Sequence, residues 1–222
     1  MKHELTLRSI EPVTHNVHCL RFDKPKGFVF KPGQAVEMRL DRDGWRDKAR
    51  PFTMTSLPDD DFLEFTIKSY PDHGGVTEQI GTLHAGERVI IGGVFGAITD
   101  KGPGVFIAGG AGVTPFIAIL RQRHRDGALK GCTLIFTNNY EKDIIHRQEW
   151  EGMDDLKTIF TLTREDNGTL PNRMVDGAFL DEVLDGYDQR FYVCGPPPMI
   201  DAVVKVLKGR GVPDDRITVE AA

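Results

Sequence analysis

The chain has 222 residues, of which 40% are hydrophobic and 27% charged, with a net charge of −5; this fits one large or two ordinary globular domains and excludes a disordered chain. Lys and Arg form no long run, which removes any electrostatic reason to expect nucleic acid as a partner. No apolar stretch approaches the roughly 20 residues of a membrane span and the charged first ten residues lack a secretory signal, so we expect a cytoplasmic protein without a membrane span.

The first hundred residues show the period-two alternation of half-buried strands. In Phe62–Tyr70, the side chains of Leu63, Phe65 and Ile67 share one face and polar side chains share the other. Similar short segments, separated by turn residues, lie at Glu4–Ile10, Asn16–Phe22, Ala35–Leu40, Phe52–Ser56 and Glu87–Gly92. Six such strands predict an antiparallel β-barrel, and one helix is predicted over Val76–Leu83.

The pattern changes at Asp100–Gly104, after which the strand candidates become continuous apolar runs that alternate with helices. The predicted strands are Val105–Ala108, Thr133–Phe136, Thr158–Leu162, Phe191–Val193 and Ile217–Glu220. The predicted helices are Pro115–His124, His146–Gly152, Ala178–Leu184 and Pro198–Lys208. Buried strands alternating with helices predict a Rossmann-like parallel sheet covered on both faces. We therefore expect a barrel domain over residues 1–100 and an α/β domain over residues 101–222.

A glycine-rich turn follows the first strand of the α/β half directly. Gly109–Pro115 opens a helix that Thr114 is expected to cap. Glycines let a backbone approach a diphosphate, and a helix N-terminus attracts it. Pro115 replaces the third glycine of the usual dinucleotide fingerprint, so a diphosphate site and a plain tight turn both explain this segment.

A second turn of the same kind is Cys194–Met199, which follows the strand over Phe191–Val193. Because ligands of open α/β sheets bind at the carboxyl ends of the strands, both turns are expected to face one crevice. Cys194 is either a small packing residue or a neighbour of a nicotinamide ring.

In the barrel half, Arg50–Ser56 places a guanidinium, an aromatic ring and a hydroxyl on one short strand. Arg50 suits a diphosphate and Thr53 a flavin nitrogen, while Phe52 suits a ring face. About twenty residues on, Gly74–Thr77 begins the predicted helix and offers a second diphosphate-suited N-terminus.

These four segments, in this order and spacing, resemble the ferredoxin–NADP reductase superfamily, particularly its flavodoxin reductase and cytochrome b5 reductase branches. The family's Arg-x-Tyr-Ser/Thr motif is matched from Arg50 to Thr53 with Phe52 in place of tyrosine, which keeps stacking and loses a hydroxyl contact. Gly93–Gly96 is similar to the family's Gly-Pro-x-Gly turn, with Val94 in place of proline. The resemblance covers nearly the whole chain.

The resemblance implies FAD in the barrel and NADPH or NADH as the hydride donor. The implied FAD contacts are Arg50, Pro51, Phe52, Thr53, Ile67, Lys68, Tyr70, Gly74, Gly75, Val76 and Thr77. The implied coenzyme contacts are Gly110, Gly112, Val113, Thr114, Arg164, Arg173, Cys194, Gly195 and Pro196. Thr53, Cys194 and Glu220 are the catalytic candidates; Glu220 is one because the sequence after it lacks the aromatic residue that shields the flavin in many relatives.

The implied activity is that of an FAD-dependent reductase that passes electrons to a separate acceptor: flavodoxin, ferredoxin, a haem protein, a quinone or free flavin. Cys19, Cys132 and Cys194 lie too far apart in sequence to hold an Fe–S centre, so no metal is expected. The partner is then a redox protein or a small acceptor. A non-catalytic or regulatory flavin-binding electron-transfer subunit is the alternative. The choice between NADH and NADPH stays open, because Arg164 and Arg173 suit a 2′-phosphate or solvent equally.

Overall fold

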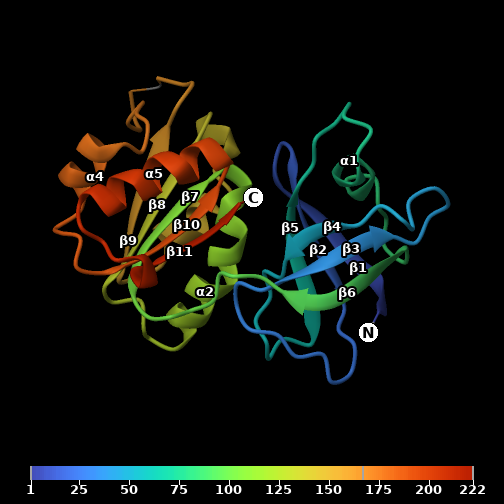
Figure 1. The fold of residues 1–222 in the computed structure, drawn as a ribbon. Coiled ribbons are helices and arrows are strands. Elements are labelled where there is room, and N and C mark those ends of the chain that lie inside the picture. Colours follow the sequence, from blue (N-terminus) through green and yellow to red (C-terminus); the bar gives the residue numbers. More distant parts are fainter. Residues whose placement is uncertain (1, 167, 222) are drawn as a thin grey trace. The chain divides into compact units, whose positions relative to one another are not determined.

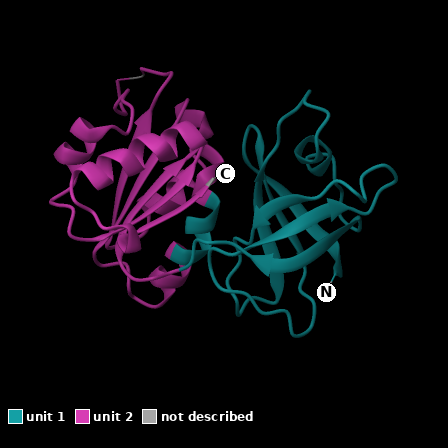
Figure 2. Cartoon of the chain, in the orientation of Figure 1, with its two compact units in different colours: residues 1–99, 114–119 teal, residues 100–113, 120–222 magenta. Residues whose placement is uncertain are grey.

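The computed structural model describes residues 2–166 and 168–221. The chain divides into two compact units, one made of residues 1–99 and 114–119 and the other of residues 100–113 and 120–222 (Figures 1 and 2). Each unit has its own sheet, and the two sheets have the two strand arrangements predicted from the sequence.

The described part of the first unit holds a six-stranded antiparallel sheet in the order β4-β3-β6-β1-β2-β5 (Figure 1). Its strands are β1 (His3–Thr14), β2 (Val17–Asp23), β3 (Ala35–Leu40), β4 (Arg50–Thr53), β5 (Phe62–Lys68) and β6 (Arg88–Phe95). An antiparallel bridge between Met54 and Phe65 joins the two edge strands and closes the barrel. Proline cannot donate to a ladder and is confined to edge strands, which fits Pro51 on β4, whose full ladder is with β3 alone.

The barrel interior is filled by the side chains that the alternation predicted to face inward. Leu63, Phe65 and Ile67 of β5 are at most 3% exposed and lie in one cluster with inward residues of the other strands. The expected strand over Phe52–Ser56 is wrong at both ends: β4 begins at Arg50 and ends at Thr53. Beyond Thr53, the backbone pairs with β5 instead, at Met54 and through Thr55 N to Glu64 O.

The helix of this unit, α1 (Val76–Ile80), is shorter than expected. Gly81 is its C-cap, since glycine has a low helix propensity and ends the helix before Leu83. Val76 and Ile80 of the helix, and Leu83 beyond its end, are nevertheless all buried in the barrel core.

The second unit has, in the part that the structure describes, a five-stranded sheet in the order β11-β10-β7-β8-β9. All its pairings are parallel, as predicted. Its strands are β7 (Gly104–Gly109), β8 (Cys132–Asn138), β9 (Leu156–Leu162), β10 (Arg190–Gly195) and β11 (Ile217–Ala221). The helices are α2 (Thr114–Arg125), α3 (Arg147–Glu151), α4 (Gly177–Val183) and α5 (Pro197–Gly209), with 3₁₀ turns η1 (Gly110–Val113), η2 (Glu141–Asp143) and η3 (Asp214–Arg216).

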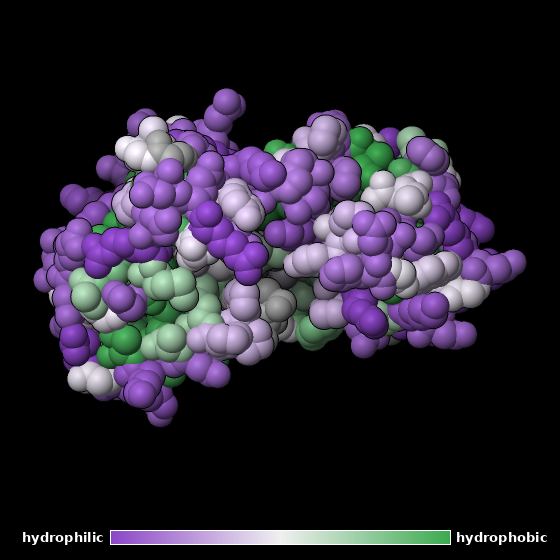
Figure 3. Space-filling view, turned by 90° about the horizontal axis from the view of Figure 1, so that it is seen from above, coloured by the Kyte–Doolittle hydropathy of each residue, from purple (hydrophilic) through white to green (hydrophobic). Residues whose placement is uncertain are grey.

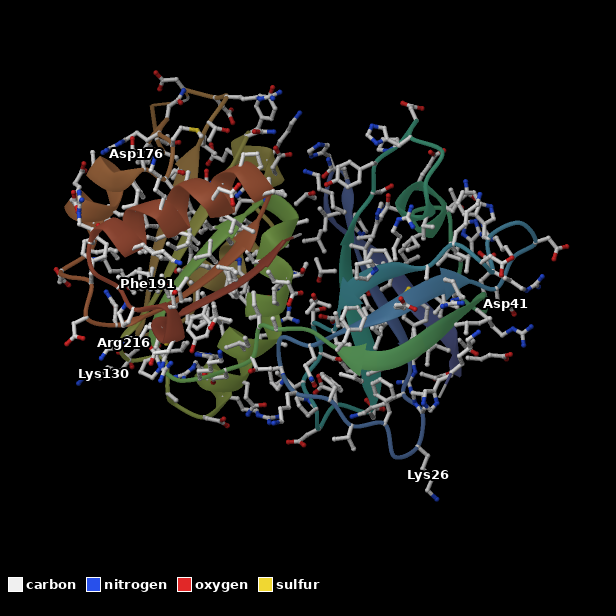
Figure 4. The ribbon with its side chains drawn as sticks, viewed as in Figure 1. Lys26, Asp41, Lys130, Asp176, Phe191 and Arg216 are labelled. Atoms are coloured by element: carbon white, nitrogen blue, oxygen red, sulfur yellow. The ribbon has the colours of Figure 1, made fainter. Side chains whose placement is uncertain are left out.

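One face of this sheet is covered by α4 and α5 (Figure 1). Val105 and Phe191 belong to this core together with Leu180 of α4 and Val203 of α5. Asp176 caps α4 by accepting a hydrogen bond from Phe179 N at 2.8 Å. Figure 4 shows Asp176 at the start of α4 and Phe191 within the sheet.

Hydrophilic side chains cover most of the face seen in Figure 3, with smaller hydrophobic areas between them. Within the described residues, every helix is too short or too polar to cross a bilayer.

Candidate functional site

The turn after β7 is built as a glycine-rich strand-to-helix connection. Gly109 is the buried last residue of β7, and Gly110 has a φ of +53°, a conformation that glycine adopts without strain. The segment Gly110–Val113 forms the 3₁₀ turn η1, and α2 follows. Thr114 does not cap α2: the N-cap is Val113, whose side chain makes no cap hydrogen bond, because η1 continues directly into the helix. Pro115 lies in the first turn, as predicted.

This turn touches the end of β10. A Cβ on Gly112 would lie 2.3 Å from Cys194 O and 2.6 Å from Gly195 N. Both are backbone atoms of β10, a strand paired on both sides, so they cannot move aside cheaply. The two predicted turns therefore lie against each other at the carboxyl edge of the sheet, and the missing side chain of Gly112 allows the contact.

Met199, in the first turn of α5, fills the space beside two further glycines. A Cβ on Gly109 would lie 2.6 Å from Met199 Sδ, and one on Gly195 would lie 2.8 Å from Met199 Cε. The helix itself starts after Pro196, which offers no side-chain cap to the first N–H groups of α5. Sequence reasoning missed Met199, although its spacing from Pro196 placed it at the helix start.

Two of the three catalytic candidates meet on this edge. Cys194 of β10 and Glu220 of β11 are partners in the parallel register, so their side chains lie on the same face. Burial, with a smaller contribution from the Glu220 charge, raises the pKa of the Cys194 thiol to about 12. The thiol is therefore neutral at physiological pH, which excludes a thiolate nucleophile. Thr53 belongs to the other unit.

The two arginines considered for a 2′-phosphate differ in their surroundings. Arg173 Nη1 donates to Glu182 Oε2 at 2.5 Å, and its guanidinium lies 5.1 Å from the centre of the Phe179 ring. The exposed Arg164 side chain makes no such contact with any described residue, although its backbone N–H donates to Asn139 O at 3.1 Å. Of these two arginines, Arg164 is thus the one whose guanidinium has no carboxylate partner among the described residues.

The ends of β8 and β9 also carry polar side chains that the sequence analysis did not select. Thr137, Asn138 and Thr161 are buried, and their side-chain polar atoms have no hydrogen-bond partner among the described residues. The sequence did contain a signal for Thr137 and Asn138, because these polar residues directly follow the apolar run that ends at Phe136.

In the barrel, the Arg50–Thr53 motif presents groups that suit a flavin nucleotide. Arg50 is exposed and has no carboxylate partner within residues 2–166 and 168–221; its Nη1 donates only to Ala49 O, at 2.8 Å. Phe52 packs partly on the barrel core and remains half-exposed. The half-exposed Thr53 hydroxyl makes no hydrogen bond to a described residue. A free guanidinium, a ring and a free hydroxyl on one strand fit FAD.

The second group of implied FAD contacts in the barrel, around Lys68–Gly75, has features that suit a diphosphate and one that opposes it. Tyr70 is 42% exposed, stacks on His73 and has the Lys68 ammonium 5.8 Å from its ring centre. Gly74 and Gly75 have open space where a Cβ would stand. However, Gly74 N already donates to Glu78 Oε2 at 2.7 Å, which places a carboxylate at the start of α1.

Three other implied FAD contacts lie on the same stretch of chain. Ile67 and Val76 have their side chains in the barrel core, and Thr77 is half-buried in the first turn of α1.

Known proteins match this architecture over nearly the full chain. The family of oxidoreductase FAD-binding domains matches residues 4–99, and the family of oxidoreductase NAD-binding domains matches residues 106–205. The reductase component of propane 2-monooxygenase from Mycolicibacterium smegmatis is 29% identical over 95% of this chain and 65% of its own length. NADH-cytochrome b5 reductase 1 from Candida glabrata is 29% identical over 95% of this chain and 80% of its own length.

The fold is shared with the cytochrome b5 reductase domain of Ulva prolifera nitrate reductase, with a TM-score of 0.88 at 20% identity over 99% of this chain and 97% of that one. The chain belongs to the ferredoxin–NADP reductase superfamily and carries its FAD-binding and NAD(P)-binding domains. It spans 64%, 65% and 60% of three propane 2-monooxygenase reductase components that it matches.

Proposed function

We propose that this chain takes hydride from NADH or NADPH and passes the electrons to a separate acceptor. Bound FAD supplies the redox chemistry, because a flavin accepts a hydride and can release electrons singly or in pairs. The contact of Gly112 with Cys194 O and Gly195 N carries the proposal. It aligns two turns at one sheet edge, where a dinucleotide binds in open α/β folds.

Each unit contributes a binding role. Arg50 pairs with the FAD diphosphate, Thr53 hydrogen-bonds the flavin edge and Phe52 flanks the ring. The turn from Gly110 to Thr114 receives the coenzyme diphosphate on its backbone N–H groups. The end of β10, from Cys194 to Pro196, borders the nicotinamide.

Cys194 acts through its size and neutrality. Its buried thiol keeps its proton, since burial holds its pKa near 12. A neutral, apolar group beside the nicotinamide excludes water and places no charge next to a ring that gains positive charge when hydride leaves. Glu220, the register partner of Cys194 on β11, is the proposed acid of this strand pair.

The acceptor is proposed to be a separate redox protein or a small molecule. Relatives include reductase components of propane 2-monooxygenase and of the naphthalene 1,2-dioxygenase system, whose names imply partner proteins. Flavodoxin, ferredoxin, a haem protein, a quinone and free flavin are the acceptor classes to compare.

The test is to purify the chain, record its flavin spectrum and add NADH or NADPH without air. Bleaching of the flavin absorbance within seconds by either coenzyme supports hydride transfer, and the two rates give the coenzyme preference. A yellow protein that neither coenzyme bleaches supports a regulatory flavin-binding subunit instead. A colourless protein that stays colourless when FAD is added contradicts both.

A further inference from the structure

A buried carboxamide lies at the carboxyl end of β8. Asn138 is the last residue of this strand and is only 5% exposed. Neither Nδ2 nor Oδ1 of its side chain has a hydrogen-bond partner in the part of the chain that the structure describes. Its backbone carbonyl, in contrast, accepts from Thr163 N at 2.9 Å and from Thr163 Oγ1 at 3.3 Å. Buried side-chain amides are almost always paired, so this one requires an explanation.

Packing does not explain the carboxamide. Asn138 follows three buried apolar residues, Leu134 to Phe136, and the buried Thr137. Its register partner on β9 is the fully buried Leu162. Leucine has the same number of side-chain heavy atoms and the same branching at Cγ as asparagine, and at this position it would leave no polar group unpaired.

The strand register places Asn138 beside the glycine turn. Gly109 of β7 pairs with Thr137 of β8. Asn138 is one residue further, at the level of Gly110, where η1 begins. Successive side chains of a strand point to opposite faces, so Asn138 lies on the face opposite to Thr137.

The order of the strands decides which half of a dinucleotide approaches β8. The diphosphate turn follows β7, which lies between β10 and β8. Under the proposed function the nicotinamide lies at Cys194 on β10. The adenosine half then extends in the other direction, over the ends of β8 and β9.

We propose that the Asn138 carboxamide recognises a hydroxyl of the adenosine-side ribose of NAD(P)H; the proposal rests on the proposed function. The chemistry of the amide fits this group, because Nδ2 needs an acceptor and Oδ1 needs a donor, and the position of Asn138 beside the diphosphate turn places the ribose next to it. A ribose hydroxyl supplies both, whereas an ionised phosphate oxygen only accepts. The contact requires a small shift of the Asn138 side chain or of η1, and Gly110 has open space where a Cβ would stand.

The test compares Asn138→Leu with Thr161→Val in the FAD-loaded chain. Thr161 is fully buried on β9, and its hydroxyl has no hydrogen-bond partner among the described residues. Its register partner is Thr137, so its side chain lies on the face opposite to Asn138. The readouts are the Kd for ADP-ribose by calorimetric titration and the Tm. Neither substitution is expected to lower the Tm, since each removes buried polar atoms that lack a partner.

Only Asn138→Leu is expected to weaken the binding of ADP-ribose. Its Kd should rise about tenfold, which corresponds to about 1.4 kcal/mol. An unchanged Kd overturns the proposal, as does a weaker Kd that Thr161→Val shares or that accompanies a lower Tm. Inorganic diphosphate, which lacks the ribose, is expected to bind both variants as it binds the parent chain. A parent chain that does not bind ADP-ribose contradicts the proposed function itself, whereas equal binding by parent and Asn138→Leu contradicts this inference alone.

Discussion

Gly112 and Gly110 lie in the same turn but are glycines for different reasons. A Cβ on Gly112 would lie 2.3 Å from a backbone oxygen, whereas Gly110 has open space and a φ of +53°. We expect Gly112→Ala to push η1 away from β10, to destabilise the unit by about 1–3 kcal/mol and to weaken NAD(P)H binding at least tenfold. Gly110→Ala is expected to cost about 1–2 kcal/mol of backbone strain with a smaller loss of affinity. Urea unfolding and coenzyme titration of both variants test this, and equal losses of affinity would contradict it.

Cys194 gives the chain a specific response to alkaline pH. Burial raises the pKa of its thiol from near 9 to about 12 in the folded chain. The unfolded thiol therefore ionises first, and stability that is fully present below pH 9 is lost as the pH rises toward 12. We expect the Tm to fall more steeply between pH 9 and 11 in the parent chain than in Cys194→Ala. The corresponding slopes of the free energy of unfolding against pH differ by at most about 1.4 kcal/mol per pH unit. Burial also raises the pKa of Cys132, but this residue is present in both chains. Identical slopes would show that Cys194 does not cause the alkaline loss.

At the scale of single elements, α4 depends on its cap. The helix has seven residues and begins where the Asp176 carboxylate accepts from Phe179 N at 2.8 Å. Asp176→Ala is expected to reduce the free energy of unfolding by about 1 kcal/mol, whereas Asp176→Ser keeps a capping oxygen and recovers most of it. Urea denaturation of the three chains measures the difference. If Ser is as destabilising as Ala, the carboxylate does not act as a cap.

The periodicities of the sequence predicted the elements well, because each reflects burial within one element. The alternation of Leu63, Phe65 and Ile67 and the continuous run from Val105 to Ala108 both appear as strands. The apolar face of β5 lies in the core as expected, but the strand is not half-buried, because Glu64 and Thr66 on its other face are buried too. Ends were less predictable when a neighbouring element decides them. The strand β4 ends at Thr53 because Met54 pairs with β5, a long-range pairing that the local sequence does not encode.

Site residues were predictable where a local sequence motif indicates their chemistry. They were not predictable where the site depends on how distant elements pack together. The glycines from Gly109 to Gly112 were visible as a turn. That Gly112 lies against β10 depends on strand order, as does the pairing of Cys194 with Glu220. The hydrogen bond from Gly74 N to the Glu78 carboxylate was equally unpredictable from the sequence, since it depends on the conformation of the first turn of α1.

At the scale of the whole molecule, the proposed function divides between two units whose binding roles are separable. Arg50 lies in the first unit and has no competing carboxylate among the described residues, while Gly112 lies in the second. We expect Arg50→Ala to lower FAD affinity at least tenfold, since hydrogen bonds to charged groups contribute about 1.5–3 kcal/mol, without changing ADP-ribose affinity. Gly112→Ala is expected to show the reverse: full flavin content, weak ADP-ribose binding and slow bleaching by NAD(P)H.

The measurements are the flavin-to-protein absorbance ratio after dialysis and the Kd for ADP-ribose, made on both variants and the parent chain. Each variant serves as the control for the other, because both are single substitutions in the same 222-residue chain. Loss of both ligands in both variants would mean that the units do not bind independently. In that case a change in one unit would have to be transmitted to the other, and the assignment of Arg50 to FAD and of the Gly110–Thr114 turn to the coenzyme could not rest on these variants.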